Sequence, residues 1–267
     1  MHRLIFACWN GISVALLLVL LPAHSSAMTA QEKGLSIAQE IDRRDQGWGD
    51  QRVSMQMILR NRQGQESRRQ IRVHTLEVDG DGDKSLTIFD EPRDLKGTAF
   101  LSFTHAIEPD DQWLYLPSIK RVKRISSANK SGPFMGSEFA YEDLTSQEVA
   151  KYTYRWLRDE NLEGRESMVV ERIPVYENSG YTRQLVWVDK TFWQPLKIDY
   201  YDRKDSLLKT LIASDYQYYE QRFWRASNMQ MHNHQSGKST ELKRYGFQLM
   251  TGLSEADFDR NSLQRAR

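Results

Sequence analysis

The chain has 267 residues and is almost balanced in charge, with 37 lysine and arginine residues against 36 aspartate and glutamate residues. This balance argues against a protein that binds nucleic acid through its overall charge, and 39% hydrophobic residues argue against a disordered chain. The only cysteine, Cys8, leaves no partner for an intramolecular disulfide, so the fold must rest on a large core.

The first residues have the pattern of a secretory signal peptide. Arg3 gives a positive start, an apolar run extends from Gly11 to Leu21, and Ser25 and Ala27 place small residues before a cleavage site. We therefore predict a signal peptide at residues 1–27 and cleavage after Ala27.

The predicted cleavage releases a single domain at residues 28–267 into the periplasm. Cys8 lies inside the leader, so the mature chain would carry no lipid anchor. A retained membrane anchor is the alternative, but Asn10, Ser13 and Pro22 interrupt the run. A spanning helix needs about 18 unbroken apolar residues.

An amphipathic helix is predicted over residues 29–45. Leu35, Ala38 and Ile41 recur every three positions, and Ile37 lies four positions before Ile41. Gly47-Trp48-Gly49 ends the pattern, because glycine relaxes the backbone where the chain turns.

Beyond Val53 the apolar period changes to two, which predicts strands. Polar turns such as Asn61–Gly64 and Asp79–Asp83 separate them. The expected strands are residues 53–59, 69–78, 85–89, 98–105, 112–125, 166–175, 182–189, 195–201, 207–219, 224–233 and 241–249.

Two further helices are expected. One covers residues 141–152, where Thr145 and Glu148 have the spacing of a capping box, and another begins near Ser254, with Asp257 three residues on. The fold class is therefore mainly β, of the α+β type, with one antiparallel sheet decorated by helices.

Several strands carry apolar residues on both faces, as in Phe100–Phe103, Trp113–Leu116 and Leu185–Val188. Both faces of the sheet must therefore be covered. A curled sheet with few helices would leave an apolar interior free for a ligand, whereas a fully packed β-sandwich or barrel is the alternative.

Two segments carry a family resemblance. Trp113–Ile125, which contains Trp-Leu-Tyr-Leu-Pro, and Gly132–Leu144, which contains Met-Gly-Ser-Glu-Phe, resemble the LolA-like family of outer-membrane lipoprotein-sorting proteins. The resemblance continues through Trp193–Lys197 to the closing strands. It implies a half-open β-barrel of the LolA/LolB type, with helices as a lid over an apolar cavity for acyl chains. It also implies a periplasmic location and a membrane transporter of the resistance-nodulation-division (RND) type as partner.

Methionine and aromatic side chains suit the wall of such a cavity, because methionine adapts to irregular apolar shapes and rings supply area with few rotamers. Ordinary core packing is the alternative for each one. The predicted cavity residues are Met55, Met57, Phe103, Trp113, Tyr115, Tyr154, Trp156, Trp187, Met229 and Met231.

The strongest local charge bias lies just before the second motif. Lys120, Arg121, Lys123 and Arg124 would meet anionic headgroups or an acidic transporter face, with Phe134 and Met135 exposed beside them in a glycine-flanked loop. The alternative is a solvated strand edge that its positive charges protect from aggregation.

No metal or cofactor is expected. Asp79, Asp81 and Asp83 imitate the start of a calcium loop, but Lys84 occupies the position that needs glycine, so a polar turn is predicted. His232 and His234 share a strand face, and no further ligand completes a set.

No catalytic motif is present either, neither a nucleophile elbow nor a phosphate-binding glycine loop, so the chain is predicted not to be an enzyme. The sequence thus predicts a carrier for lipid or lipoprotein acyl chains. The alternative is a non-catalytic adaptor subunit of an RND-type transporter with a filled core.

Overall fold

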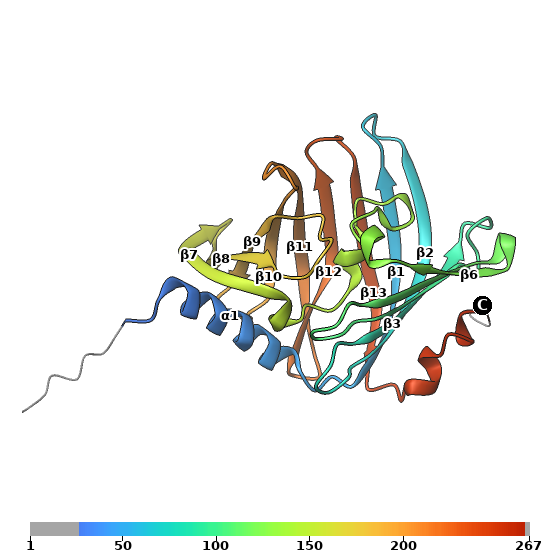
Figure 1. The fold of residues 1–267 in the computed structure, drawn as a ribbon, viewed down its shortest axis with the longest axis horizontal. Coiled ribbons are helices and arrows are strands. Elements are labelled where there is room, and N and C mark those ends of the chain that lie inside the picture. Colours follow the sequence, from blue (N-terminus) through green and yellow to red (C-terminus); the bar gives the residue numbers. More distant parts are fainter. Residues whose placement is uncertain (1–26, 265–267) are drawn as a thin grey trace, which may run out of the picture.

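The computed structural model describes residues 27–264, so the predicted signal peptide, apart from Ala27, lies outside the described residues. One antiparallel sheet of 13 strands forms the body, and helix α1 (Ala30–Asp45) crosses one side of it (Figure 1). The strands are β1 (Asp50–Arg60), β2 (Glu66–Leu76), β3 (Lys84–Glu91), β4 (Ala99–Phe103), β5 (Asp111–Leu116), β6 (Arg121–Ile125), β7 (Tyr152–Leu162), β8 (Arg165–Pro174), β9 (Arg183–Asp189), β10 (Pro195–Tyr201), β11 (Leu207–Tyr219), β12 (Phe223–Asn233) and β13 (Ser239–Leu249).

The strand order is β6-β5-β4-β3-β2-β1-β13-β12-β11-β10-β9-β8-β7. Each strand pairs with its sequence neighbour except at two places. β1 pairs with β13 in the middle of the sheet, and β6 and β7 form the two edges without pairing to each other. The sheet is therefore a half-open barrel, as predicted.

Helix α1 confirms the amphipathic helix predicted at residues 29–45. The backbone N–H of Glu32 donates to Thr29 Oγ1 at 3.2 Å, and the Glu32 carboxylate accepts from the Thr29 N–H at 2.8 Å, which completes a capping box. At Gly34 an added Cβ would lie 2.7 Å from the backbone nitrogens of Arg155 and Trp156. The missing side chain thus lets α1 approach the β7 backbone closely.

The strand predicted over residues 112–125 is wrong in one respect, because it is two strands. Pro117–Ile119 form a 3-10 turn, and Lys120 follows with a left-handed φ of 49°. β6 then folds back on β5 as a hairpin, with Leu116 opposite Arg121.

The helix predicted over residues 141–152 is also wrong. Only two short 3-10 helices form there, Tyr141–Leu144 and Val149–Lys151. The Thr145 hydroxyl does not cap a helix but donates back to the carbonyl oxygen of Glu142 at 3.1 Å. Tyr152 then begins β7, a strand that the sequence pattern did not indicate.

The helix predicted near Ser254 shrinks to a 3-10 helix, Glu255–Phe258, although its capping box with Asp257 is present. The Ser254 N–H donates to the Asp257 carboxylate at 2.8 Å.

Apolar residues on the two faces of the sheet form two separate clusters. Neighbours alternate between them, so that Phe100 and Leu114 belong to one cluster and Leu101 and Trp113 to the other. The inner cluster includes Ile37 of α1 and lies on the face that α1 covers. The outer cluster is covered by the C-terminal residues Leu253, Phe258 and Leu263. This division explains why several strands are apolar at consecutive positions.

Candidate functional site

The inner face is occupied by residues 126–151, which we call the central segment. This green segment runs inside the curve of the sheet in Figure 1. Its Phe134 and Phe139 are 1% and 2% exposed and belong to the inner cluster. The Phe134 ring lies 5.2 Å from that of Phe100 and 5.9 Å from that of Phe89. The space inside the sheet is thus filled by side chains of the chain itself.

Tight turns aim Phe134 inward. Met135 and Gly136 both have left-handed φ values, 50° and 77°, and the Phe134 N–H donates to the Phe139 carbonyl at 2.7 Å. The prediction that this loop exposes Phe134 is therefore wrong, because the reversal points the ring into the core. Met135 is only half-buried, and its carbonyl oxygen accepts from Arg69 Nη1 at 2.7 Å.

The central segment is bonded to one half of the sheet through buried polar groups. Lys209 Nζ of β11 donates to an Asp143 carboxylate oxygen at 2.6 Å and to the Glu138 carbonyl at 2.8 Å. The side chains of Lys209 and Asp143 are each 4% exposed. Thr240 Oγ1 of β13 accepts from the Glu138 N–H at 3.0 Å, and Asn233 of β12 donates to the Glu138 carboxylate at 2.7 Å.

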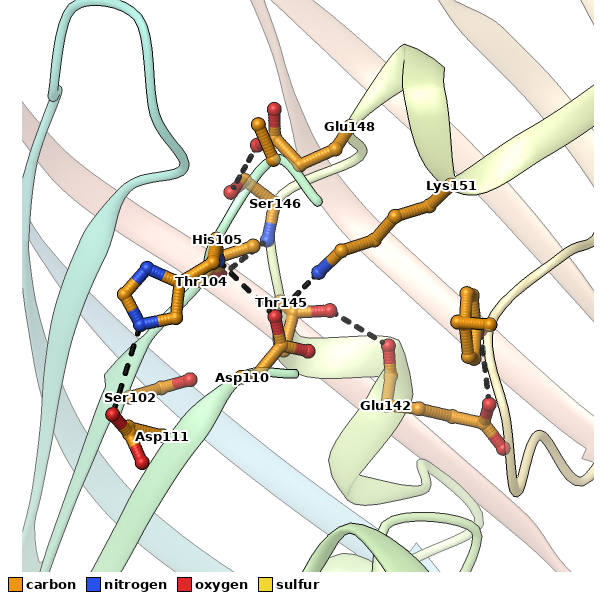
Figure 2. Close-up of polar contacts among 12 residues, drawn as sticks. Ser102, Thr104, His105, Asp110, Asp111, Glu142, Thr145, Ser146, Glu148 and Lys151 are labelled. Carbon is orange, nitrogen blue, oxygen red and sulfur yellow. Dashed lines mark hydrogen bonds and ion pairs between the residues drawn. The ribbon is translucent and has the colours of Figure 1, made fainter. Parts of the chain in front are cut away.

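The other half of the sheet is bonded to the same segment (Figure 2). Lys151 forms an ion pair with Asp110, just before β5, and the Ser146 N–H donates to Thr104 Oγ1 at 3.3 Å. Gln112 of β5 donates to the Tyr141 carbonyl at 3.4 Å. The segment therefore ties together strands that lie far apart in the strand order.

Glu142 is a second buried carboxylate of this network. It is 5% exposed and accepts from the Gly180 N–H at 2.8 Å, Ser179 Oγ at 3.0 Å and Tyr176 OH at 3.1 Å. Burial, followed by the charge of Asp143, raises the pKa of Glu142.

A small hollow of about 10 Å³ lies beside Glu142, with Lys130 stacked 3.8 Å over the Tyr176 ring. Such a volume holds about one water molecule. The residues that line it are Asp110, Lys130, Glu142, Thr145, Ser146, Lys151, Tyr152 and Tyr176. This arrangement fixes the segment in place and offers no room for a lipid chain.

The acidic turn before β3 packs against the central segment. Asp81 accepts from the Ala106 N–H at 2.8 Å and lies 2.9 Å from His105 Nδ1, and the hydrogen bond with His105 lowers the pKa of Asp81 to about 2. Burial, followed by the charge of Glu148, raises the pKa of Asp83 to about 7.

Residues 27–264 contain no group of three or more histidine, cysteine or acidic side chains placed to hold a metal ion. The rings of His232 and His234 lie 5.0 Å apart.

The predicted cavity residues do not all lie on one face. Met55, Met57 and Met231 are buried in the inner cluster, and Met229, Tyr154 and Trp156 pack against it. By contrast, Trp113 belongs to the outer cluster, and Phe103 and Tyr115 pack against that one.

Trp187 is placed apart from both sets. It lies between Val186 and Val188, which both belong to the inner cluster, so its ring faces the other side of the sheet. Its Nε1 donates to Glu160 at 3.1 Å, and Lys197 lies 4.1 Å over the ring.

The predicted basic docking residues lie on a sheet edge. Lys120, Arg121, Lys123 and Arg124 are exposed on or next to β6, whose outer side pairs with no described strand. Arg124 forms an ion pair with Asp111.

Sequence reasoning missed the buried ion pairs of the central segment. A usable signal was Lys209, a charge among the three leucines of the strand start at residues 207–211. A lysine in that position needs a buried anionic partner, since a charge removed from water without one is costly. The sequence also contains candidates for that partner, the adjacent carboxylates Glu142 and Asp143, which stand among aromatic residues.

Among residues 27–264, no helix combines the length and the apolar character that crossing a bilayer requires.

Comparison with known proteins identifies relatives over most of the chain. The profile of a family described only as an uncharacterized protein matches residues 81–265. An outer membrane lipoprotein-sorting protein domain from Vibrio parahaemolyticus is 58% identical, with a TM-score of 0.87, over 88% of this chain and 100% of that one. A DUF1329 family protein from Desulfovibrio piger is 30% identical, with a TM-score of 0.84, over 88% of this chain and 99% of that one.

A LolA superfamily protein from Nitrosomonas europaea shares the fold, with a TM-score of 0.70 at 21% identity, over 88% of this chain and 100% of that one. No curated protein sequence matches the chain.

Proposed function

This chain belongs to the LolA-like family of outer membrane lipoprotein-sorting proteins, and from that membership we propose that it is a periplasmic, non-catalytic carrier of lipid acyl chains. The acyl chains would lie on the inner face of the half-open barrel, against Met55, Met57 and Met231. The signal peptide predicted at residues 1–27 would deliver it to that compartment.

The observation that carries this proposal is that the inner face is covered by the central segment rather than by another layer of sheet. The segment contributes only two fully buried large side chains to that face, Phe134 and Phe139. If the segment moved out, Met57, Phe89 and Met231 would line an apolar trough.

The hydrophobic part of this exchange is energetically feasible. Burying a phenylalanine contributes up to about 3 kcal/mol, and burying each methylene of an acyl chain contributes about 0.8 kcal/mol. An acyl chain with about ten buried methylenes would therefore offset the loss of both rings. Its affinity would need no polar contact.

Lipid retention tests the proposal. Met57→Asp and Met231→Asp place a charge on the inner face and should abolish the lipid that co-purifies with the wild-type protein from the cell envelope, as measured by extraction and mass spectrometry. Met250→Asp is the matched control, because Met250 is 60% exposed. Folded inner-face variants that carry the wild-type lipid load would refute a role for these side chains.

An adaptor role is the second candidate, because Phe134 and Phe139 already fill the interior. In that role the protein would brace an RND-type transporter through the basic edge formed by Lys120, Arg121, Lys123 and Arg124. Wild-type protein without any bound acyl material, which nevertheless co-purifies with a transporter until these four residues are changed to glutamine, would favour the adaptor.

A further inference from the structure

A second, larger hollow lies outside the inner face, at the C-terminal end of α1. Its volume is about 460 Å³, which is within the range of small-molecule sites in proteins. Three elements form it: the last turn of α1, the turn between β9 and β10, and the hairpin between β11 and β12. Its lining residues are Arg43, Arg44, Asp45, Thr191, Phe192, Gln194, Tyr218, Gln221, Arg222 and Trp224.

One wall of this hollow is a ladder of aromatic rings. Tyr218 and Trp224 face each other across β11 and β12, with ring centroids 4.8 Å apart and an interplanar angle of 35°. The Phe192 ring continues the ladder at 5.1 Å from Trp224 and 32°. Phe192 is 8% exposed and Tyr218 is 52% exposed, so the ladder rises from the core to the surface.

The ladder is held by a defined turn. Glu220 and Gln221 both have left-handed φ values, 49° and 50°, and the Arg222 N–H donates to the Tyr219 carbonyl at 3.0 Å, so the two residues are the centre of a β-turn in a three-residue hairpin loop. Tyr218 OH donates to the Gln221 carbonyl, which fixes its ring against the turn. The flat surface therefore exists without a ligand.

Arginines from two elements form the rim. Arg44 Nε donates to Glu40 at 2.6 Å, and the guanidinium carbon lies 4.9 Å over the Trp193 ring. The two terminal nitrogens of Arg44 have no hydrogen-bond partner among residues 27–264. Arg222 Nη2 donates to the Gln46 carbonyl, and the guanidinium carbon lies 5.0 Å over the Phe223 ring. Its Nε and Nη1 have no hydrogen-bond partner in the described chain. Arg43 Nη1 also has no hydrogen-bond partner among these residues, because only Nε and Nη2 of Arg43 donate to Glu40.

The charge of the hollow is positive. Its lining contains three arginines and a single carboxylate, Asp45, which is engaged by Arg225. Guanidinium groups with unused donors match the oxygen geometry of phosphate, and several of them converge best on a group that offers three acceptor oxygens.

We propose that this hollow binds an organic phosphate, with its phosphate held by Arg44 and Arg222 and its glycerol or sugar part lying on Tyr218 and Trp224. Such a group is found on glycerophospholipids and on phosphorylated glycolipids of the envelope. The site is distinct from the inner face, so it adds a headgroup site to a protein proposed to bind acyl chains.

Titrations with acyl-free probes test the site without involving the inner face. Glycerol 3-phosphate, glucosamine 1-phosphate and inorganic phosphate would each be added to the full protein up to about 10 mM, with amide and indole N–H signals followed by NMR. At least one organic phosphate should bind at least tenfold more tightly than inorganic phosphate and shift Trp224. The tighter of the two probes identifies the source of the headgroup.

Substitutions make the test specific. Arg44→Gln with Arg222→Gln should weaken organic phosphate binding at least tenfold, and Arg44→Gln alone, at an exposed position, should weaken it measurably. Tyr218→Ala should weaken organic phosphate but not inorganic phosphate. Arg68→Gln with Arg158→Gln is the control, because these arginines are exposed and do not line the hollow.

The proposal is overturned if no probe gives a saturable shift, if inorganic phosphate binds as tightly as the organic phosphates, or if the arginine substitutions leave the affinity unchanged. None of these results would bear on the retention of acyl chains by the inner face.

Discussion

At the scale of single residues, Lys209 shows how a buried charge can hold the central segment in place. Its side chain is 4% exposed, and its ammonium group neutralises Asp143, which also accepts from Tyr181 OH at 2.8 Å and the Ala140 N–H at 2.7 Å. The pair therefore connects β11 directly to the central segment.

Lys209→Met should lower the free energy of unfolding by about 3–5 kcal/mol, because it leaves Asp143 buried without a counter-charge. Urea unfolding measures this change. The matched control is Lys190→Met, whose ion pair with Asp159 is 35% and 44% exposed and should change the free energy of unfolding far less. Similar losses in the two variants would mean that the buried pair does not hold the segment.

The raised pKa of Asp83 makes the stability of the protein depend on pH in a defined direction. Its pKa is about 7 in the folded protein against a usual value of 3.8, so the folded state binds the proton more tightly than the unfolded state. The contribution of Asp83 to stability is therefore fully present below about pH 4 and is lost as the pH rises towards 7.

Asp83→Asn should remove this loss. The variant should be more stable than the wild type by about 1–3 kcal/mol at pH 8, and the difference should vanish or reverse at pH 4. Urea unfolding at the two pH values checks it. An equal difference at both values would show that Asp83 does not titrate in this range.

Single residues were the hardest part to predict from the sequence. Phe134 was expected to be exposed because glycines flank its loop, yet the left-handed Met135 and Gly136 produce the reversal that buries it. Met55 and Met57 share one face of β1, because a period of two within a strand determines the face. Trp113 and Trp187 were assigned to the same face wrongly, since spacing within one strand does not say how faces match between strands.

At the scale of elements, the contact between α1 and β7 depends on the missing side chain of Gly34. In an open helix, alanine would be favoured over glycine by about 1 kcal/mol. Here the new Cβ would lie 2.7 Å from the backbone of Arg155, so the helix must move away.

Gly34→Ala should therefore destabilise the packing of α1 by about 1–3 kcal/mol in spite of its better helix propensity. Hydrogen exchange of the α1 amides should accelerate, while exchange in β12 and β13 should not. Gln39→Ala on the exposed side of the same helix should leave exchange unchanged or slower. Equal exchange in wild type and Gly34→Ala would contradict the close contact.

Elements with a clear period were predictable, and those without one were not. α1, β10 and β11 follow from their periodicity and the turn residues around them. β7 was not predicted because charged residues interrupt its apolar alternation, as in Arg-Asp-Glu-Asn at residues 158–161. The helix expected over residues 141–152 failed because tertiary hydrogen bonds of Glu142 and Asp143 outweigh local capping signals.

At the scale of the whole molecule, the central segment joins the two halves of the half-open barrel. The half-open barrel itself was implied by the family resemblance and is confirmed, whereas the filled interior could not be read from the sequence. Displacing the segment would change the connection between strands far apart in the sheet.

Addition of palmitate should increase hydrogen exchange at the Phe134 and Glu142 amides, whose present acceptors are the carbonyls of Phe139 and Lys130. Exchange in β12 and β13 should stay constant. The Met57→Asp variant should show no such response. Palmitate binding with unchanged protection of the central segment would show that the ligand lies elsewhere.

The pairing of β1 with β13 has a consequence for biosynthesis. β1 is the first strand to be made and β13 the last, yet they are neighbours in the middle of the sheet, with Met57 opposite Leu242. Until β13 has been synthesised, β1 keeps an unpaired edge, and such edges invite aggregation. Assembly is therefore expected to finish only after the whole polypeptide is available, and to be slow, on a timescale of about milliseconds to seconds, because this pairing is so distant along the chain.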